Sequence, residues 1–223
     1  IYNRGIGVYS WLESSGSCKT LRGRIPVFLG EFAGKRVLVK KLSHGGLFSF
    51  LTGDRFVSRT RLIRSMESSD FLINHDIFTP AIEFIAWKRS GLFFQLETGI
   101  EYIEDGTDAA TFFFGNQLIN QQKPDLTRAF EIGQTVRKIH DIGFYHPDLN
   151  FMNFLLVEGK MPILLDLDKG RPPKGQLPDC IRRKNLSRLY RSVRKEGRNS
   201  CDDLVDQVVE VIQKGYETTS AQV

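Results

Sequence analysis

The expected fold is decided by two stretches, His146-Pro147-Asp148-Leu149-Asn150-Phe151-Met152-Asn153 and Ile163-Leu164-Leu165-Asp166-Leu167-Asp168. The first has the pattern H-x-D-L-x-x-x-N, and the second ends an apolar run with an aspartate thirteen residues after the asparagine. Asp148, Asn153 and Asp166 thus offer two carboxylates and an amide oxygen at a defined spacing. Phosphoryl transfer uses such groups to position the acceptor hydroxyl and to hold magnesium at the phosphates. Polar residues in an ordinary strand, loop and strand are the alternative interpretation.

This spacing resembles the catalytic loop of protein kinases and their metal-binding D-F-G aspartate, with Leu167 and Asp168 in place of phenylalanine and glycine. The resemblance implies an α+β, protein-kinase-like fold with two lobes. We expect residues 1–97 to form an N-terminal lobe of antiparallel sheet and one helix, which binds the ATP phosphates. We expect residues 98–223 to form a mostly helical C-terminal lobe, which carries the catalytic loop and the metal site.

Length and composition are compatible with this architecture. A chain of 223 residues is long enough for one domain or for two small lobes, and its apolar content of 41% is ordinary for a globular protein. No apolar run reaches the ~20 residues needed to cross a bilayer, and residues 1–11 show no signal-peptide pattern. Cys18, Cys180 and Cys201 are widely spaced, which argues against a disulfide framework or a zinc site and favours the reducing cytoplasm.

The net charge of +5 is concentrated in residues 182–198, which we call the basic segment. Eight basic residues there stand against the single acid Glu196, so the segment carries +7 and the rest of the chain −2. A local basic face predicts an anionic partner such as phosphate groups, a membrane surface or nucleic acid. A solvated helix face without a partner is the alternative. Tyr190 is the segment's only aromatic residue, which argues against nucleic acid.

A strand in the first part of the chain supplies the expected phosphate-binding lysine. Residues 26–32 and 36–41 are apolar, β-branched runs, and Gly34 between them predicts the turn of a hairpin. The second run contains Val-Leu-Val-Lys, which resembles the kinase strand whose lysine contacts the α- and β-phosphates. Alternation puts Lys40 and Lys41 on opposite faces; we choose Lys40 and keep Lys41 as the alternative.

Two other elements are assigned to the ATP phosphates. Arg22-Gly23-Arg24 predicts a tight turn, and in a kinase this turn lies over the phosphates. We therefore assign Gly23 and Arg24 to phosphate binding. An ordinary surface turn is the alternative. A helix with an apolar face is expected over residues 59–73, and Glu67 is its only glutamate. We assign Glu67 to pair with Lys40, as in kinases, with a solvated Glu67 as the alternative.

The expected lobe boundary follows a second strand pair. Residues 81–87 and 92–96 predict antiparallel strands, and Glu97-Thr98-Gly99 then breaks the pattern as a hinge would. A helix is expected from Leu126 to about His140, capped by Asp125 and stopped by Gly143.

Two histidines near the catalytic stretch are expected to be structural. His140 is interpreted as a packed side chain, and His146 as a residue that orders the loop by hydrogen bonding, since Asp148 is the better-placed base. Asp168 is predicted either to touch a second metal ion or to cap its loop. The loop after Asp168 is short and no A-P-E sequence follows it, which argues against a protein substrate. Two helices, over residues 181–196 and 202–214, are expected to close the chain.

Taken together, these motifs resemble those of the lipopolysaccharide-core kinases of Gram-negative bacteria, above all the kinases of 3-deoxy-D-manno-octulosonic acid (Kdo). The resembling features extend from about Arg22 to Tyr216. They are Arg22-Gly23-Arg24, Val39-Lys40, Gly45-Gly46, Gly53-Asp54-Arg55-Phe56, Arg59-Thr60-Arg61, Tyr145 to Asn150, Leu165 to Gly170 and Asn185-Leu186-Ser187-Arg188-Leu189. The chain departs from the family pattern at Leu167, where phenylalanine is usual, and at Pro147, where a small residue is common. The family's helix glutamate falls nearer Ser65 than Glu67.

The resemblance implies an ATP- and Mg²⁺-dependent kinase that phosphorylates a Kdo hydroxyl on a lipid A precursor, at the cytoplasmic face of the inner membrane. It makes Asp148 the base, Asn153 and Asp166 metal ligands and Lys40 the phosphate-binding lysine. The anionic, lipid-linked acceptor is the expected partner, with membrane contact through residues 182–198 and no nucleic acid. A kinase of heptose, an aminoglycoside or another small molecule is the main alternative, followed by a protein kinase and by a pseudokinase scaffold.

Overall fold

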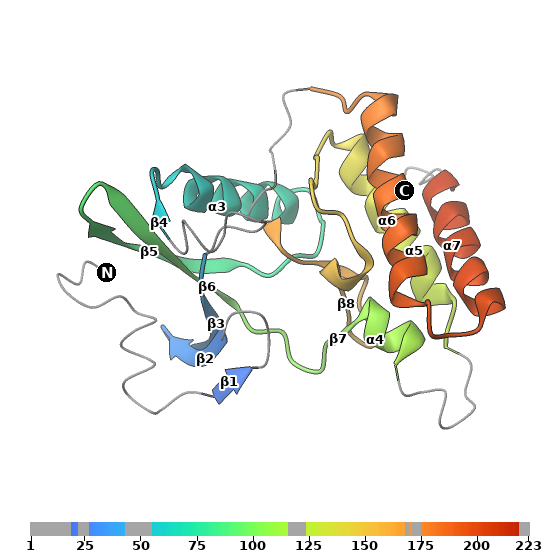
Figure 1. Cartoon of the computed structure of the whole chain (residues 1–223), viewed down its shortest axis with the longest axis horizontal. Coiled ribbons are helices and arrows are strands. Elements are labelled where there is room, and N and C mark those ends of the chain that lie inside the picture. The colour runs from blue at the N-terminus through green and yellow to red at the C-terminus, as the bar shows by residue number, and fades with distance from the viewer. Residues whose placement is uncertain are drawn as a thin grey trace. The chain divides into compact units, whose positions relative to one another are not determined.

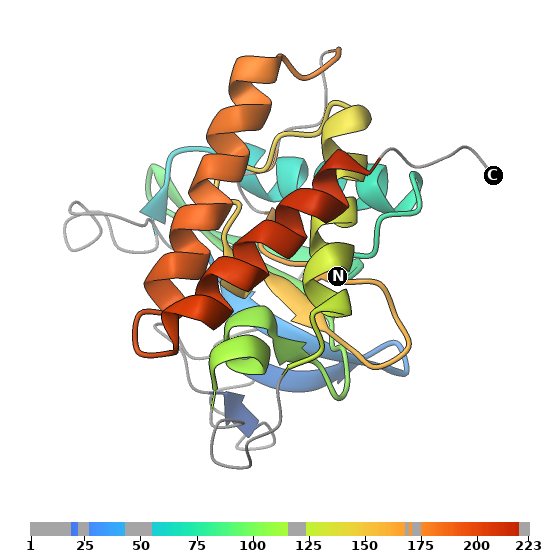
Figure 2. The same ribbon diagram turned by 90° about the vertical axis from the view of Figure 1, so that its right-hand side faces the viewer.

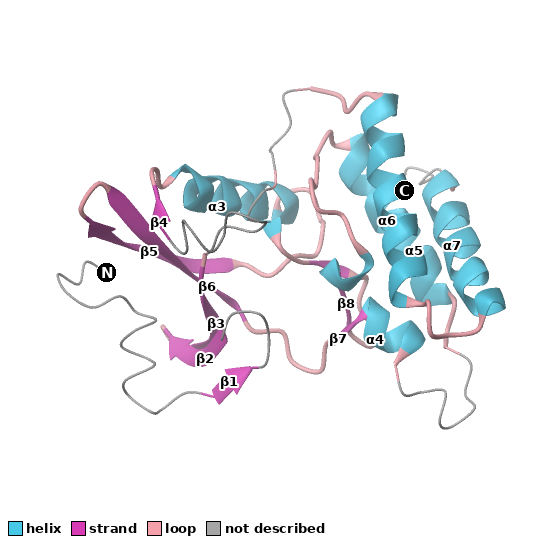
Figure 3. Cartoon of the chain, viewed as in Figure 1, coloured by secondary structure: helices cyan, strands magenta, loops and turns pink. Residues whose placement is uncertain are grey.

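The computed structural model describes residues 19–21, 27–42, 55–115, 124–167, 170 and 175–218. The chain divides into two compact units, which we call the N-terminal unit (residues 1–69 and 80–103) and the C-terminal unit (residues 70–79 and 104–223). Figures 1 and 3 show that strands dominate the first unit and helices the second, which confirms the predicted α+β class. Within the described residues, no helix is long and apolar enough to span a membrane.

The N-terminal unit is built on an antiparallel sheet. Its described strands are β1 (Lys19–Leu21), β2 (Val27–Phe32), β3 (Lys35–Lys41), β4 (Arg55–Phe56), β5 (Ile82–Ser90) and β6 (Phe93–Glu101). The order along the sheet is β1-β2-β3-β6-β4, and β5 also pairs with β6. The β2–β3 hairpin turns at Ala33 and Gly34, whose φ angles of 51° and 77° suit a tight two-residue turn. The predicted hairpin is confirmed.

Strand β6 passes without a break through the segment predicted to be the hinge. Glu97, Thr98 and Gly99 are paired with β3 on one side and β5 on the other, and the division between the units falls after Ile103 rather than after Glu97. Gly99 is needed for packing, since any Cβ there would overlap with the ring of Phe84 on β5. The predicted interruption at residues 97–99 is therefore wrong, because this glycine makes room for an aromatic neighbour within the sheet.

Helix α3 (Thr60–Ile73) confirms the helix expected over residues 59–73. Leu62 on α3 packs with Leu42, Phe56 and Leu96 in a small buried cluster. A separate cluster joins Phe28, Val37 and Val39, so the sheet is apolar on both faces. Because side chains alternate along a strand, Lys40 lies on the face of Leu42 and α3, and Lys41 on the face of Val37 and Val39.

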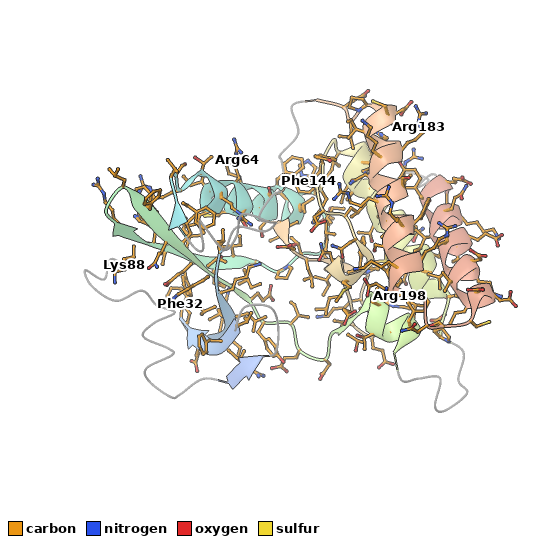
Figure 4. All side chains as sticks on the ribbon, in the orientation of Figure 1. Phe32, Arg64, Lys88, Phe144, Arg183 and Arg198 are labelled. Carbon is orange, nitrogen blue, oxygen red and sulfur yellow. The ribbon has the colours of Figure 1, made fainter. Side chains whose placement is uncertain are left out.

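The C-terminal unit packs helices around one large core. Its helices are α4 (Ala109–Phe114), α5 (Thr127–Asp141), α6 (Asp179–Glu196) and α7 (Asp202–Glu217), with the short 3₁₀ helix η2 (Phe151–Asn153) and a small sheet of β7 (Thr107–Asp108), β8 (Phe154–Leu156) and β9 (Ile163–Leu164). Phe113, Phe144, Phe151 and Phe154 are among its fully buried side chains; Figure 4 labels Phe144. The helices predicted over residues 126–140, 181–196 and 202–214 are confirmed to within a few residues.

Sequence signals also fixed the ends of α5. Asp125 accepts a hydrogen bond from the Thr127 amide (2.9 Å), as a helix-starting aspartate does. Gly143 has φ +77°, and the following Phe144 amide donates to the Ile139 carbonyl (2.8 Å), which closes the last turn. The chain then passes directly into the catalytic stretch.

Helices α5 and α7 approach closely because each has a glycine at their crossing (Figure 2). A Cβ on Gly133 would overlap with the carbonyl oxygen of Ile212, and a Cβ on Gly215 would overlap with that of Phe130. The contact is therefore backbone against backbone from both sides, with no flexible side chain that could move aside.

Gly133→Ala should lower the free energy of unfolding by about 3 kcal/mol, since the added methyl group must push the two helix backbones apart. Gly159→Ala is the matched control. Gly159 has φ +69° in an open turn with nothing near its Cβ position, so its replacement should cost only about 1 kcal/mol of backbone strain. Urea denaturation of both variants measures the difference. Equal costs would show that α5 and α7 can separate freely at this crossing.

Candidate active site

The catalytic stretch is a loop anchored by buried apolar side chains. Leu149 and Phe151 are fully buried, whereas Met152, which follows Phe151, is exposed. Asn150 precedes η2, and its side-chain oxygen accepts a hydrogen bond from the backbone amide of Asn153 (3.2 Å). This local cap explains why the motif needs a short polar residue immediately after Leu149.

Asp148 and Asn153 are joined by a hydrogen bond. The Asn153 side-chain amide donates to the Asp148 backbone carbonyl (2.9 Å), which also receives the Asn150 side-chain amide (3.2 Å). Because Nδ2 of Asn153 is used in this way, its Oδ1 is the atom left to act as an acceptor or ligand. The carboxyl side chain of Asp148 is partly exposed.

The backbone of Leu165 ties Asp166 to the same loop. The Leu165 amide donates to the Asn153 carbonyl (2.8 Å), and the Leu165 carbonyl accepts from Nε2 of His146 (3.1 Å). His146 thus orders the loop by hydrogen bonding, as expected. Asp166 follows in a left-handed conformation (φ 60°) with an exposed side chain, while the next residue, Leu167, is buried in the apolar position where phenylalanine is usual. Left-handed backbone at a non-glycine residue costs energy and is concentrated at functional sites.

Helix α6 contacts the catalytic loop at three positions along one of its faces. The Asn185 side-chain amide donates to the His146 carbonyl (2.8 Å), Arg188 lies 3.5 Å from a carboxylate oxygen of Asp148, and Ser192 Oγ accepts from the Phe151 amide (2.6 Å). Residues 185, 188 and 192 share a helix face at the spacing i, i+3, i+7. These contacts were not predicted from the sequence, although three polar residues at helical spacing within the basic segment were a signal for them.

Asn185 also connects this loop to helix α5. It is buried, and since its Nδ2 donates to His146, its Oδ1 must accept from Nε2 of His140 (3.1 Å). The other ring nitrogen of His140, Nδ1, then accepts from the Tyr216 hydroxyl (2.9 Å). His140 is fully buried, and this burial lowers its pKa from 6.5 to about 4 despite the hydrogen bond with Asn185. The expectation of a packed structural histidine is confirmed.

The lowered pKa predicts a loss of stability in mild acid. Unfolded histidine binds a proton near pH 6.5, but native His140 resists it until about pH 4, so protons favour the unfolded chain within this interval. Between pH 7 and pH 5 this residue alone should lower the free energy of unfolding by about 2 kcal/mol.

His140→Gln cannot titrate and should remove that part of the pH dependence, whatever it does to stability at pH 7. Urea unfolding of the wild type and the variant at pH 7, 6 and 5 gives the slope of the free energy of unfolding against pH for each protein. Parallel slopes would mean that native His140 binds its proton as readily as the unfolded chain does.

The predicted phosphate-binding residues belong to the N-terminal unit. Lys40 is half-buried on β3, on the sheet face that also carries Leu42. Glu67 is exposed and lies roughly 140° around α3 from the buried Leu62. Ser65 and Ser69 occupy the buried face instead. The position of Glu67 therefore argues against its predicted pairing with Lys40, because its side chain leaves the helix on the side away from the sheet.

Three predicted site residues, Gly23, Arg24 and Asp168, lie outside the described residues, as do the Gly45-Gly46 and Gly53-Asp54 elements of the family resemblance. Glu97 of the predicted hinge is a buried residue of β6 and stands opposite Lys41 in the sheet register.

The donor set of the C-terminal unit fits magnesium. Among the described residues, no group of three or more histidine, cysteine, aspartate or glutamate side chains could hold a metal ion by itself. Mg²⁺ does not require such a cage, since it is usually bound by one or two carboxylates together with water and substrate phosphates. The Asp166 carboxylate and the Asn153 amide oxygen are hard oxygen donors of this kind.

Comparison with known proteins identifies the family. The model of the "Lipopolysaccharide kinase (Kdo/WaaP) family" matches residues 34–216, which include both Lys40 and the whole catalytic loop. The chain belongs to this family. It is 26% identical over 191 residues to the 3-deoxy-D-manno-octulosonic acid kinase of Photobacterium damsela subsp. piscicida, covering 83% of this chain and 76% of that protein. It is 25% identical over 219 residues to the kinase of the same name from Xylella fastidiosa, covering 96% and 84%.

A solved structure, "WaaP in complex with acyl carrier protein", shares the fold. The TM-score is 0.53 with 16% sequence identity, and the alignment covers 92% of each chain. The kinase-like, α+β fold expected from the sequence is thus confirmed. As a member of this lipopolysaccharide kinase family, the chain is a phosphotransferase that acts on a sugar hydroxyl, and ATP is the phosphoryl donor that the family implies.

Proposed function

We propose that this kinase transfers the γ-phosphoryl group of ATP to a hydroxyl of Kdo on a lipid A precursor. The observation that carries the proposal is that hydrogen bonds join Asn153 both to the backbone of Asp148 and to that of Leu165, the residue before Asp166, within one unit. This arrangement supplies the three groups that the sequence pattern calls for. The Kdo kinases named above support Kdo as the sugar.

Asp148 orients the acceptor hydroxyl and accepts its proton as the oxygen attacks the γ-phosphorus. Its backbone carbonyl is held by two amide side chains, which fixes the backbone from which the carboxylate projects. A positioned carboxylate of this kind contributes through alignment as well as proton transfer.

On the donor side, Asp166 and Asn153 would hold Mg²⁺, and Asp168 would either contact a second metal ion or cap its loop. The bound ion supplies charge neutralisation at the phosphate oxygens. Lys40 pairs with the α- and β-phosphates, and Gly23 and Arg24, which lie outside the described residues, are assigned to the same phosphates. We assign the ATP phosphates to the N-terminal unit and the catalytic loop to the C-terminal unit, in place of the predicted lobes 1–97 and 98–223.

The acceptor is an anionic, lipid-linked sugar, which places the enzyme at the cytoplasmic face of the inner membrane. The basic segment supports this assignment, because many of its side chains are exposed on one helix; Figure 4 labels Arg183 and Arg198 near its two ends. Exposed lysine and arginine near a membrane surface are attracted to anionic lipid headgroups.

Asp148→Asn should lower the rate of phosphoryl transfer by at least about a hundredfold, because the amide cannot accept the hydroxyl proton. Binding of ATP should remain close to that of the wild type, since the donor-side ligands are unchanged. Asp206→Asn, which removes an exposed carboxylate from α7, is the matched control and should retain activity. Normal turnover by Asp148→Asn would refute the assignment of the base.

Mass spectrometry of a Kdo-lipid A precursor after incubation with ATP and Mg²⁺ tests the substrate. A mass gain of one phosphate is expected for the wild type and none for Asp148→Asn. The same assay with heptose-containing core, an aminoglycoside and a generic protein substrate tests the alternatives. Phosphorylation of one of these, with Kdo unmodified, would replace the proposed acceptor, and no transfer or ATP hydrolysis at all would favour a scaffold.

A further inference from the structure

Helix α6 borders a depression of about 540 Å³ in the C-terminal unit. Four of its lining residues are cations, Arg183, Lys184, Arg188 and Arg191, and no carboxylate is among the lining residues. Tyr145 lines it from the catalytic loop, while Asn185, whose amide holds that loop, lies beneath. A hollow that is lined by cations attracts an anion more strongly than a convex basic surface does.

The basic segment divides into two sets by its contacts. Arg182 pairs with Asp141 at the end of α5 (2.8 Å), Arg194 with Asp206 of α7 (3.9 Å) and Lys195 with its neighbour Glu196 (3.2 Å). Arg183, Lys184 and Arg191 have no ion-pair partner among the described residues, and all three are exposed in the depression. On α6, the cations without an ion-pair partner therefore lie together at this depression, whereas exposed Arg198 follows the end of the helix.

Arg188 connects this depression to the base. Its guanidinium is half exposed and lies 3.5 Å from Oδ1 of Asp148, the outer limit of a hydrogen bond. Exposed pairs of this kind are weak and exchange readily. Guanidinium has five N–H donors in a planar fork that matches a carboxylate, so Arg188 can bind a second anion while it stays beside Asp148.

We propose that this depression is a carboxylate subsite for the reacting sugar, in which Arg188 holds the acid group so that a hydroxyl of the same sugar faces Asp148. The inference rests on the proposed function, because it takes an acidic sugar as the acceptor. Arg188 is thus a specificity-determining residue, and Arg183, Lys184 and Arg191 supply the surrounding positive field.

The proximity of the subsite to the base favours the sugar acid over other anions of the acceptor. Kdo carries its carboxylate on the ring that receives the phosphoryl group, whereas the phosphates of a lipid precursor lie on different sugars. An anion held within one side-chain contact of Asp148 must therefore belong to the sugar that reacts. The Kdo carboxylate and the lipid phosphates are both oxyanions that accept hydrogen bonds from guanidinium. They can be distinguished by removing one or the other from the acceptor.

The test compares Arg188→Gln, Arg188→Lys and wild type on three acceptors: the native Kdo precursor, the same molecule with its carboxylate reduced to an alcohol, and the same molecule without its lipid phosphates. With the native and the dephosphorylated acceptor, Arg188→Gln should raise KM by about tenfold to a hundredfold, the usual value of a charge-assisted contact. With the carboxyl-reduced acceptor, Arg188→Gln and wild type should have equal KM. Arg188→Lys should recover part of the loss, since it keeps the charge without the fork.

Arg64→Gln is the matched control. Arg64 is an exposed arginine of α3, labelled in Figure 4, and its replacement should leave KM unchanged for all three acceptors. Thermal unfolding of each variant checks that the fold is retained.

A penalty that disappears with the dephosphorylated acceptor would assign the depression to lipid phosphate and overturn the proposal. An equal penalty on all three acceptors would make Arg188 only an electrostatic neighbour of Asp148, with the same consequence. If the wild type modifies no Kdo acceptor, the proposed function fails. The subsite is then judged by calorimetric titration of free Kdo into wild type and Arg188→Gln. Binding that is lost in the variant supports the subsite, and equal or absent binding refutes it.

Discussion

The side-chain amide of Asn185 is the interaction on which the C-terminal unit depends. Its nitrogen donates to the His146 carbonyl and its oxygen accepts from the His140 ring, so one buried group joins α5, α6 and the catalytic loop. Leaving a buried polar group unpaired costs about 1–3 kcal/mol, so none of the three partners can move without a penalty at the other two. The depressed pKa of His140 belongs to the same constraint, because the ring is packed where a charge is poorly solvated.

Helix α6 has two neighbouring stripes of side chains, one in contact with the catalytic loop and the other exposed to solvent. The stripe of Asn185, Arg188 and Ser192 meets backbone and carboxylate groups of the catalytic loop. The adjacent stripe contains Arg183 and Arg191 and faces the depression. The basic residues, which are contiguous in the sequence, therefore have different roles in the structure. Some of them form ion pairs within the C-terminal unit, and others remain exposed.

Elements with strong local signals were predicted well from the sequence. The β2–β3 hairpin, the stop of α5 at Gly143 and the closing helices follow from turn chemistry and periodicity, which act over a few residues. One prediction was wrong because a residue was assigned by its type rather than its surroundings: Gly99 was interpreted as a break although it admits the Phe84 ring. The assignment of Glu67 to Lys40 rested on residue type in the same way, and its exposed position on α3 favours the alternative of a solvated side chain. The contacts of α6 with the loop join residues about 40 positions apart, and only tertiary packing reveals them.

The backbone of Leu165 has a consequence for the position of Asp166. Its amide and its carbonyl are both hydrogen-bonded to the catalytic loop, one to Asn153 and the other to His146, so the residue before Asp166 is held against the loop that contains Asp148. Rotation of this segment would break both hydrogen bonds at once. The positions of Asp148, Asn153 and Asp166 are thus set by hydrogen bonds within the C-terminal unit itself.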